Sequence, residues 1–273
     1  MTPAKGQQYL PVKDYEAAAN AVERFTGALL LHLSSRELDT RHLVIRNFIA
    51  RGASSLKSIC HVWQLGHYQD CWILYRCLLD RLFHLKALID SNEFELFEKW
   101  SFKEQIEANN RVISDMELKG MIEPDLFRPT RKQRERYAQL KAEGVDWHRP
   151  KAEVVAKTMD LPFLYKYGYD YASQHIHPMA NDGQHDYLRV TRQRFEMPFD
   201  QRMILNNSLL VQIILTQEGL NASRLEWQRL VLNFLTDLML FLRSGSQGYQ
   251  QTLRKLMDAG PEFEWSQEAT QPG

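Results

Sequence analysis

Apolar residues recur at helical spacing along most of the chain, with polar residues between them. Side chains at i, i+3, i+4 and i+7 share one face of a helix, so this spacing is typical of amphipathic helices. On this basis the first half of the chain is predicted to form five helices, over residues of about 12–33, 34–65, 68–89, 94–116 and 131–143.

Two short patterns predict where helices begin. Ser34 and Glu37 form an S-x-x-E capping box, in which each side chain bonds the other residue's backbone N–H. This pair is expected to start the second helix. Asp90 and Glu93 are expected to start the fourth in the same way.

Residues 160–177 fit two periodicities. Their aromatic residues alternate, as in a strand, but Phe163, Tyr167 and Tyr171 also follow i, i+4 spacing. A helix is favoured because no second strand is evident, and an isolated strand is not stable. Residues 151–159 show a weaker helical pattern.

The remainder of the chain is predicted to be a long loop and a helical hairpin. Residues 178–197 are rich in Asn, Asp, Gly and Gln, as loops are, and a loop of this length is often functional. The hairpin has arms at about 199–217 and 223–243, with a turn at 218–221 and a second capping box from Ser223.

These elements predict an all-α protein, a helical bundle with a long basic insertion and a C-terminal helical hairpin. We expect a single domain over residues 1–260, with the insertion at 119–151 and a fraying tail at 261–273.

Composition excludes several classes of protein. The 273 residues are 44% hydrophobic and carry no formal net charge, so neither general disorder nor a wholly basic binding protein is expected. The three cysteines, Cys60, Cys71 and Cys77, form no CxxC pair and predict reduced core thiols. The start lacks the apolar stretch of a signal peptide, and the run from Leu230 to Leu242 is too short to span a bilayer. We therefore expect a cytoplasmic protein without a membrane partner.

The third helix carries polar residues that a buried helix does not need. It is apolar almost all round, yet Arg76, Asp80 and His84 share one face at i, i+4 spacing. Burying such groups without partners would cost several kcal/mol. Two interpretations stay open: an Arg76–Asp80 ion pair that serves the fold, or a polar cluster that lines a pocket.

A second polar group lies at the end of residues 160–177. His175 and His177 flank Ile176, and Pro178 ends any helix here. One histidine could act as a general acid or base, or the pair could ligate a metal, or the two could simply cap and pack. No HExxH or repeated ExxH pattern supports a metal, so we expect neither a metal nor another cofactor.

These two places resemble an uncharacterised all-helical family of bacterial and phage-borne proteins, with the motifs L-x-R-x-x-x-E and S-x-x-x-H-P. Arg76, Ser173, His177 and Pro178 match the motifs, and Asp80 stands where the family has Glu. The resemblance implies a helical fold over roughly residues 40–240. Such proteins are distantly similar to HEPN domains, many of which cleave RNA with an Arg-x(4–6)-His motif and form homodimers. Arg36 and His42 match that looser pattern.

The predicted insertion is locally basic. Residues 128–151 contain eight Lys or Arg against three acids, with Tyr137 and Trp147 as aromatic residues that could stack on bases. A charge run is more often a solvated face. The candidate nucleic-acid contacts, including two arginines of the later loop, are Arg131, Lys132, Arg134, Arg136, Arg192 and Arg194.

Two functions follow as hypotheses. The first is a bacterial defence or toxin-like effector that cleaves RNA without a metal, with His177 as acid or base, Arg76 stabilising the transition state, and Asp80 and Ser173 beside them. The second is a non-catalytic helical module that binds protein or nucleic acid. A metal-dependent hydrolase using Asp80, His175 and His177 is a minor third.

Overall fold

The secondary structure is helical throughout the residues that the computed structural model describes, which are 9–34, 38–115, 127–177, 180, 183–193, 200–223 and 229–259. No strand occurs among these residues, so the predicted all-α class is confirmed. None of the helices in these ranges is long and apolar enough to cross a membrane.

The chain forms two compact units. Unit 1 comprises Met1–Ala87 and Pro150–Gly273, and unit 2 comprises Leu88–Arg149. The division falls within the third helix of the chain, and unit 2 contains most of the segment predicted as a basic insertion.

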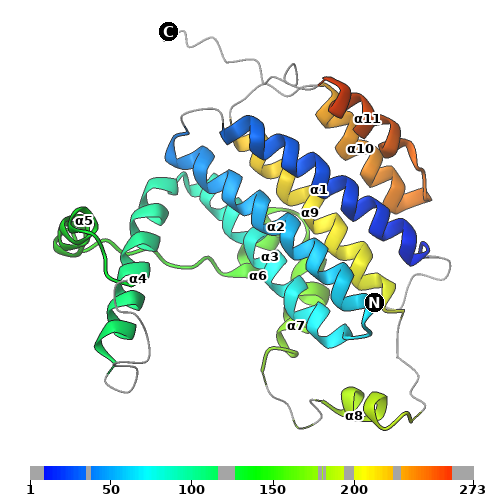
Figure 1. Ribbon diagram of the computed structural model, residues 1–273, viewed down its shortest axis with the longest axis horizontal. Helices are drawn as coiled ribbons and strands as arrows, with labels where there is room; N and C mark the ends of the chain where they lie inside the picture. The colour runs from blue at the N-terminus through cyan, green and yellow to red at the C-terminus, as the bar shows by residue number, and fades with distance from the viewer. Residues whose placement is uncertain are drawn as a thin grey trace. The chain divides into compact units, whose positions relative to one another are not determined.

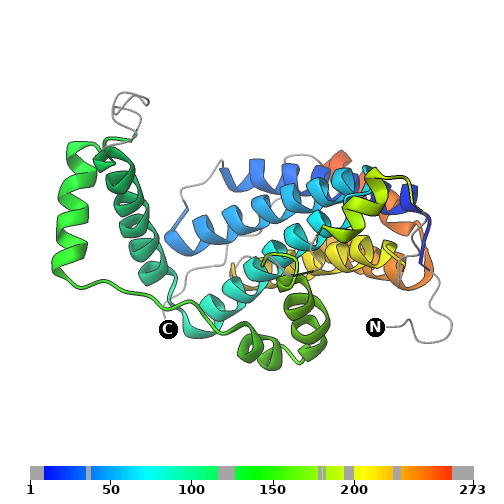
Figure 2. The same ribbon diagram turned by 90° about the horizontal axis from the view of Figure 1, so that it is seen from below.

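The core of unit 1 is a bundle of long helices, α1 (Val12–Ser34), α2 (Thr40–Gln64), α3 (Tyr68–Ser91) and α9 (Arg202–Ala222). Helices α1, α2 and α9 contact one another and lie side by side in both ribbon views (Figures 1 and 2). The apolar stripes predicted from spacing face this core; Ile45, Ile49 and Ile59 are at most 1% exposed.

Two glycines let α2 and α9 approach closely. A Cβ on Gly52 would lie 2.3 Å from the side-chain oxygen of Gln212 and 2.6 Å from a methyl of Leu215. A Cβ on Gly219 would lie 3.0 Å from a methyl of Ile45. Gly219 is therefore a helix–helix contact within α9, and the turn predicted at residues 218–221 is wrong. Ser223, predicted to cap the next helix, instead ends α9 and donates to the carbonyl of Leu220 at 2.6 Å.

The C-terminal helices are α10 (Arg229–Ser244) and α11 (Gly248–Ala259). They pack on each other, with α10 also against α9 and α11 against α1. Asp237 of α10 accepts a hydrogen bond of 2.5 Å from Thr252 of α11 and so links the two helices. Helix α11 was not predicted from the pattern of apolar residues.

Both predicted capping pairs at the earlier helix starts are wrong. Helix α1 continues to Ser34, and α2 begins after Asp39, whose carboxylate accepts from the backbone N–H of His42 at 2.8 Å. Glu37 and Arg36 lie outside the described residues. Asp90 belongs to α3, and Glu93 precedes α4 without a side-chain cap.

Unit 2 is built on α4 (Phe94–Ser114) and α5 (Arg131–Ala142), which contact each other. A small aromatic cluster joins α4 to the segment after α5: the ring of Trp147 lies 4.8 Å from that of Phe97 and 5.2 Å from that of Trp100. Arg136 pairs with Glu98 at 2.5 Å, and Lys103 donates to the carbonyl of Val145 at 2.8 Å.

Four short helices of unit 1 lie between α5 and α9 in the sequence: α6 (Ala152–Thr158), η2 (Leu164–Asp170), α7 (Tyr171–Ser173) and α8 (Gln184–Val190). The helical interpretation of residues 160–177 is confirmed, but η2 is a π-helix. The long loop predicted at 178–197 is interrupted by α8, so that prediction is partly wrong.

Candidate functional site

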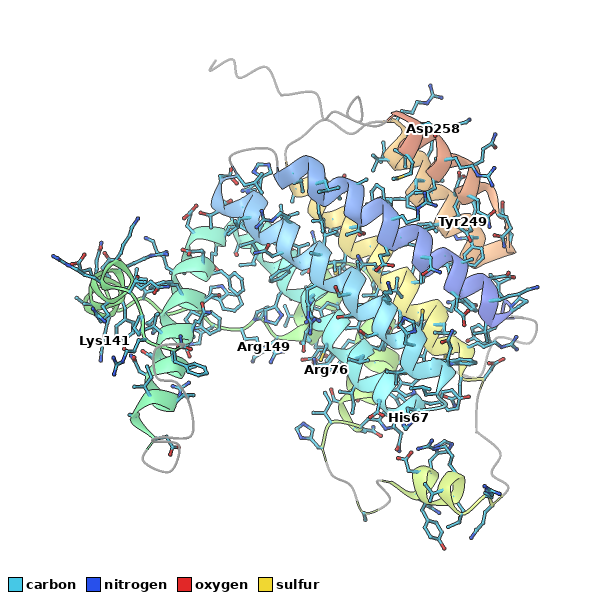
Figure 3. All side chains as sticks on the ribbon, viewed as in Figure 1. His67, Arg76, Lys141, Arg149, Tyr249 and Asp258 are labelled. Carbon is cyan, nitrogen blue, oxygen red and sulfur yellow. The ribbon has the colours of Figure 1, made fainter. Side chains whose placement is uncertain are left out.

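The polar face of α3 contacts the segment formed by η2 and α7. Arg76 Nε donates to Ser173 Oγ at 2.9 Å, and a terminal guanidinium nitrogen of Arg76 bonds the carboxylate of Asp80. The guanidinium also lies over the ring of Tyr169, 3.3 Å from its centroid. Figure 3 labels Arg76 among the side chains of unit 1. One arginine on α3 thus holds three groups, two of which come from a segment almost a hundred residues later. We call Arg76, Asp80, Tyr169 and Ser173 the arginine clamp.

The clamp is mostly buried, and its polar atoms bond one another. The side chains of Arg76 and Asp80 are 12% and 22% exposed. Ser173 Oγ, which accepts from Arg76, donates to the carbonyl of Tyr169 at 2.7 Å. One turn further along α3, His84 Nδ1 lies 2.6 Å from the carbonyl of Asp80. The face predicted from i, i+4 spacing therefore exists, and the expected Arg76–Asp80 ion pair forms on it.

The π-helical turn explains how Tyr169 reaches α3. A π-helix contains one more residue per hydrogen-bonded turn than an α-helix, and such turns often occur at functional sites. Gly168 lets this turn approach α3, because a Cβ there would lie 3.0 Å from both the hydroxyl of Tyr75 and a methyl of Leu79. Tyr169 was not among the predicted site residues, because the alternating tyrosines of residues 160–177 gave no signal for a π-helix.

The two histidines after the clamp differ in their surroundings. His175 is partly buried, with its ring stacked 6.3 Å from Trp72 and edge-on to Tyr171 at 5.2 Å. His177 is exposed, and among the described residues it is not a hydrogen-bond partner of Arg76. Pro178 lies outside the described residues. Three of the four predicted catalytic residues thus meet, and His177 does not join them.

No metal centre is formed by the residues that the structure describes, since none of them gather into a group of three or more His, Cys, Asp or Glu side chains. His42, the second residue of the looser Arg-x(4–6)-His match, bonds Asp39 at 2.6 Å and also the carbonyl of Ser223. It serves the start of α2 and its contact with the end of α9.

The predicted nucleic-acid contacts differ in how far they are exposed and in the groups that they bond. Arg136 is engaged by Glu98 and stacks over Phe102. Arg131 pairs with Glu135 at 2.8 Å but is 89% exposed. Lys132, Arg134 and Arg192 are exposed, and Arg194 lies outside the described residues. Trp147 is only 6% exposed, so the expectation that it could stack on bases is wrong: it forms part of the core of unit 2.

The comparisons with known proteins identify the family. The profile of a family of unknown function, DUF5677, matches residues 42–195. Because this match covers more than half of the 273 residues, the chain belongs to that family. No curated protein and no solved structure matched the chain. Membership of an uncharacterised family is confirmed, whereas the two motifs, the HEPN similarity and the implied homodimer stay predictions.

Proposed function

We propose that this protein is a non-catalytic helical module that binds RNA through helix α5. The observation that carries the non-catalytic part is the engagement of Arg76. Its Nε and one terminal nitrogen already donate within the chain, and its charge faces the Asp80 carboxylate and the Tyr169 ring.

Metal-free cleavage of RNA has less support from this geometry. A phosphate would have to displace Ser173 or Asp80 from a guanidinium that is only 12% exposed. A general acid or base also has to lie within hydrogen-bond reach of the reacting oxygen. His177 has no contact with Arg76 that would place both groups on one phosphodiester. The clamp is better explained as a device that fixes the π-helical segment on α3.

The RNA-binding part rests on the charges at the start of α5. Its first turn contains no acid and carries Arg131 and Lys132, followed by Arg134. Cations near a helix N-terminus are unfavourable, because the helix dipole is already positive there. Cations placed where the helix dipole disfavours them, with no evident gain in stability, are typical of a functional site. The pattern concentrates positive potential where a phosphate backbone could bind.

Structural order at the start of α5 supports the same proposal. Thr130 forms a full capping box with Gln133, with hydrogen bonds of 3.3 and 2.8 Å. Arg134 donates to the carbonyl of Pro129 at 2.9 Å, which holds its side chain against the turn. The cations are therefore presented from a fixed helix end, and less side-chain entropy is lost when a phosphate binds.

The test is the binding of a fluorescent single-stranded RNA, followed by anisotropy over a range of salt concentrations. Replacing Lys132 and Arg134 with Gln should weaken binding and lower the slope of log K against log salt by about 1.4, the value for two phosphate contacts on a single strand. The matched control replaces Arg254 and Lys255, two exposed cations of α11, with Gln. Equal losses in the two double variants, or no RNA binding by the wild type, would contradict the proposal.

A further inference from the structure

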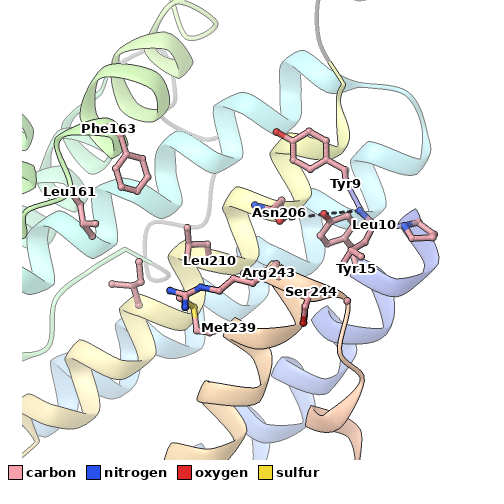
Figure 4. A pocket seen from close by; sticks show the side chains of 14 residues that line it. Tyr9, Leu10, Tyr15, Leu161, Phe163, Asn206, Leu210, Met239, Arg243 and Ser244 are labelled. Atoms are coloured by element: carbon pink, nitrogen blue, oxygen red, sulfur yellow. Dashed lines mark hydrogen bonds between the residues drawn. The ribbon is translucent and has the colours of Figure 1, made fainter. Parts of the chain in front are cut away.

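Unit 1 contains a pocket of about 910 Å³, and none of the residues of the arginine clamp line it. Its walls come from the residues before and at the start of α1, the middle of α9, the end of α10 and the segment between α6 and η2. In Figure 4, Leu161 and Phe163 lie at one end, Tyr9 and Tyr15 lie at the other, and Arg243 lies between them. Small-molecule sites in proteins are usually concave and of about 300–1,000 Å³.

Most of the pocket wall is apolar. Its apolar side chains include Leu210 and Ile214 from α9, Met239 from α10, and Leu161 and Phe163. Phe163, which lies between α6 and η2, is 40% exposed. Covering such a surface with a hydrocarbon chain is favourable at about 25 cal/mol per Å².

The polar side chains of the pocket are Tyr9, Tyr15, Asn206, Arg243 and Ser244. Tyr15 Oη accepts from the backbone N–H of Leu10 and donates to the side-chain oxygen of Asn206, each at 3.3 Å. Burial raises the pKa of Tyr15 to about 12, so this phenol stays neutral and can act only as a hydrogen-bonding group.

Arg243 gives the pocket its charge. Among the described residues that line the pocket it is the one with a full charge, and none of them is an acid. Its side chain is exposed, and no described carboxylate forms an ion pair with it. Arginine is suited to binding a planar carboxylate, because its guanidinium can donate two parallel hydrogen bonds.

We propose that this pocket binds a free amphipathic carboxylate of the fatty-acid class. The hydrocarbon chain lies along Leu161, Phe163 and Ile214, and the carboxylate pairs with Arg243, with the amide of Asn206 beside it. This site is independent of the RNA surface proposed on α5, which belongs to unit 2.

The probe for this site is dodecanoate, titrated below its micellar concentration into the full-length protein in a calorimeter. We expect saturable binding at one site per chain and a melting temperature that rises with ligand concentration. Arg243→Gln should weaken binding by about tenfold or more, as the loss of a charge-assisted pair implies. Arg254→Gln, which removes an exposed arginine of α11, is the matched control and should bind as the wild type does.

Two further arms separate the proposed ligand from other occupants. Dodecan-1-ol has the same hydrocarbon chain without the charge, so it should bind the wild type more weakly than dodecanoate does. Its affinity for Arg243→Gln should equal its affinity for the wild type. Leu210→Trp should fill the pocket and abolish binding while the circular dichroism spectrum stays that of a folded helical protein. No binding of dodecanoate, tighter binding of dodecan-1-ol, or equal affinities for the two arginine variants would each overturn the proposal.

Discussion

Replacing Arg76 with Ala should destabilise unit 1 because Arg76 joins α3 to the segment of η2 and α7. The substitution removes the hydrogen bond to Ser173, the ion pair with Asp80 and the contact with the Tyr169 ring. It also removes the Arg76 cation from the Asp80 carboxylate, whose side chain is only 22% exposed.

The size of the effect follows from the burial of the pair. Breaking a fully buried ion pair costs about 3–5 kcal/mol, whereas an exposed pair contributes about 0.2–1 kcal/mol. Arg76 and Asp80, at 12% and 22% exposure, lie nearer the buried limit but are not fully desolvated. We therefore expect a loss of about 3 kcal/mol, which corresponds to a fall in Tm of about 5 °C for a chain of this size, at about 2.1 cal/mol/K of unfolding entropy per residue.

Urea and thermal unfolding followed by circular dichroism would measure this loss. The matched control is Lys157→Ala, which breaks another i, i+4 ion pair of unit 1. In that pair the side chain of Lys157 is 65% exposed and that of its partner Glu153 is 51% exposed. That control should cost less than about 0.5 kcal/mol. A double-mutant cycle with Asp80→Ala should give a coupling energy of about 1 kcal/mol or more. The reasoning fails if Arg76→Ala is no more destabilising than the control.

Three further predictions concern other parts of unit 1. Gly168→Ala should lower the free energy of unfolding by about 1–3 kcal/mol, measured in urea, because the new Cβ meets two α3 side chains at 3.0 Å. Hydrogen bonds from Arg202 hold the pKa of Asp200 in the folded protein below its usual value. The stabilisation from this pair is therefore fully present above the pKa that Asp200 has in the unfolded chain, and it is lost as the pH falls through the pKa of Asp200 in the folded protein. Wild type should therefore be more stable than Asp200→Asn at neutral pH, with the two urea midpoints converging as the pH falls through the lowered pKa of Asp200. Burial raises the pKa of Cys60 and Cys71 to about 12, so iodoacetamide near neutral pH should label them, by mass spectrometry, only after denaturation.

Hydrophobic spacing was sufficient to predict the long helices but not all of their ends. The apolar stripe through Ile45 and Ile49 is set by the chain itself, and it packs as expected. Gly219 was mistaken for a turn because its role depends on Ile45, a residue far away in the sequence that approaches its Cα. Ser34 and Asp90 fit capping patterns, yet each belongs to the preceding helix: Ser34 is the last residue of α1, and Asp90 lies within α3. Local capping signals thus give way where packing favours a longer helix.

The candidate site was predictable only in part, because local spacing can be read from the sequence and long-range packing cannot. The i, i+4 spacing of Arg76 and Asp80 is a local property, and their ion pair followed from it. Tyr169 could not be found, because its position depends on a π-helical turn and on Gly168 fitting against α3. The pocket around Arg243 gave no sequence signal at all, since its walls come from four separate parts of the chain.

The most direct test of a non-catalytic RNA-binding role is to mix purified wild-type protein, in excess, with labelled single-stranded RNA, and to follow binding and strand length in the same sample. We expect bound RNA that stays intact, with the same result for His177→Ala. Shortening of the RNA by the wild type, lost in His177→Ala while that variant stays folded, would contradict the proposal and make His177 a catalytic residue.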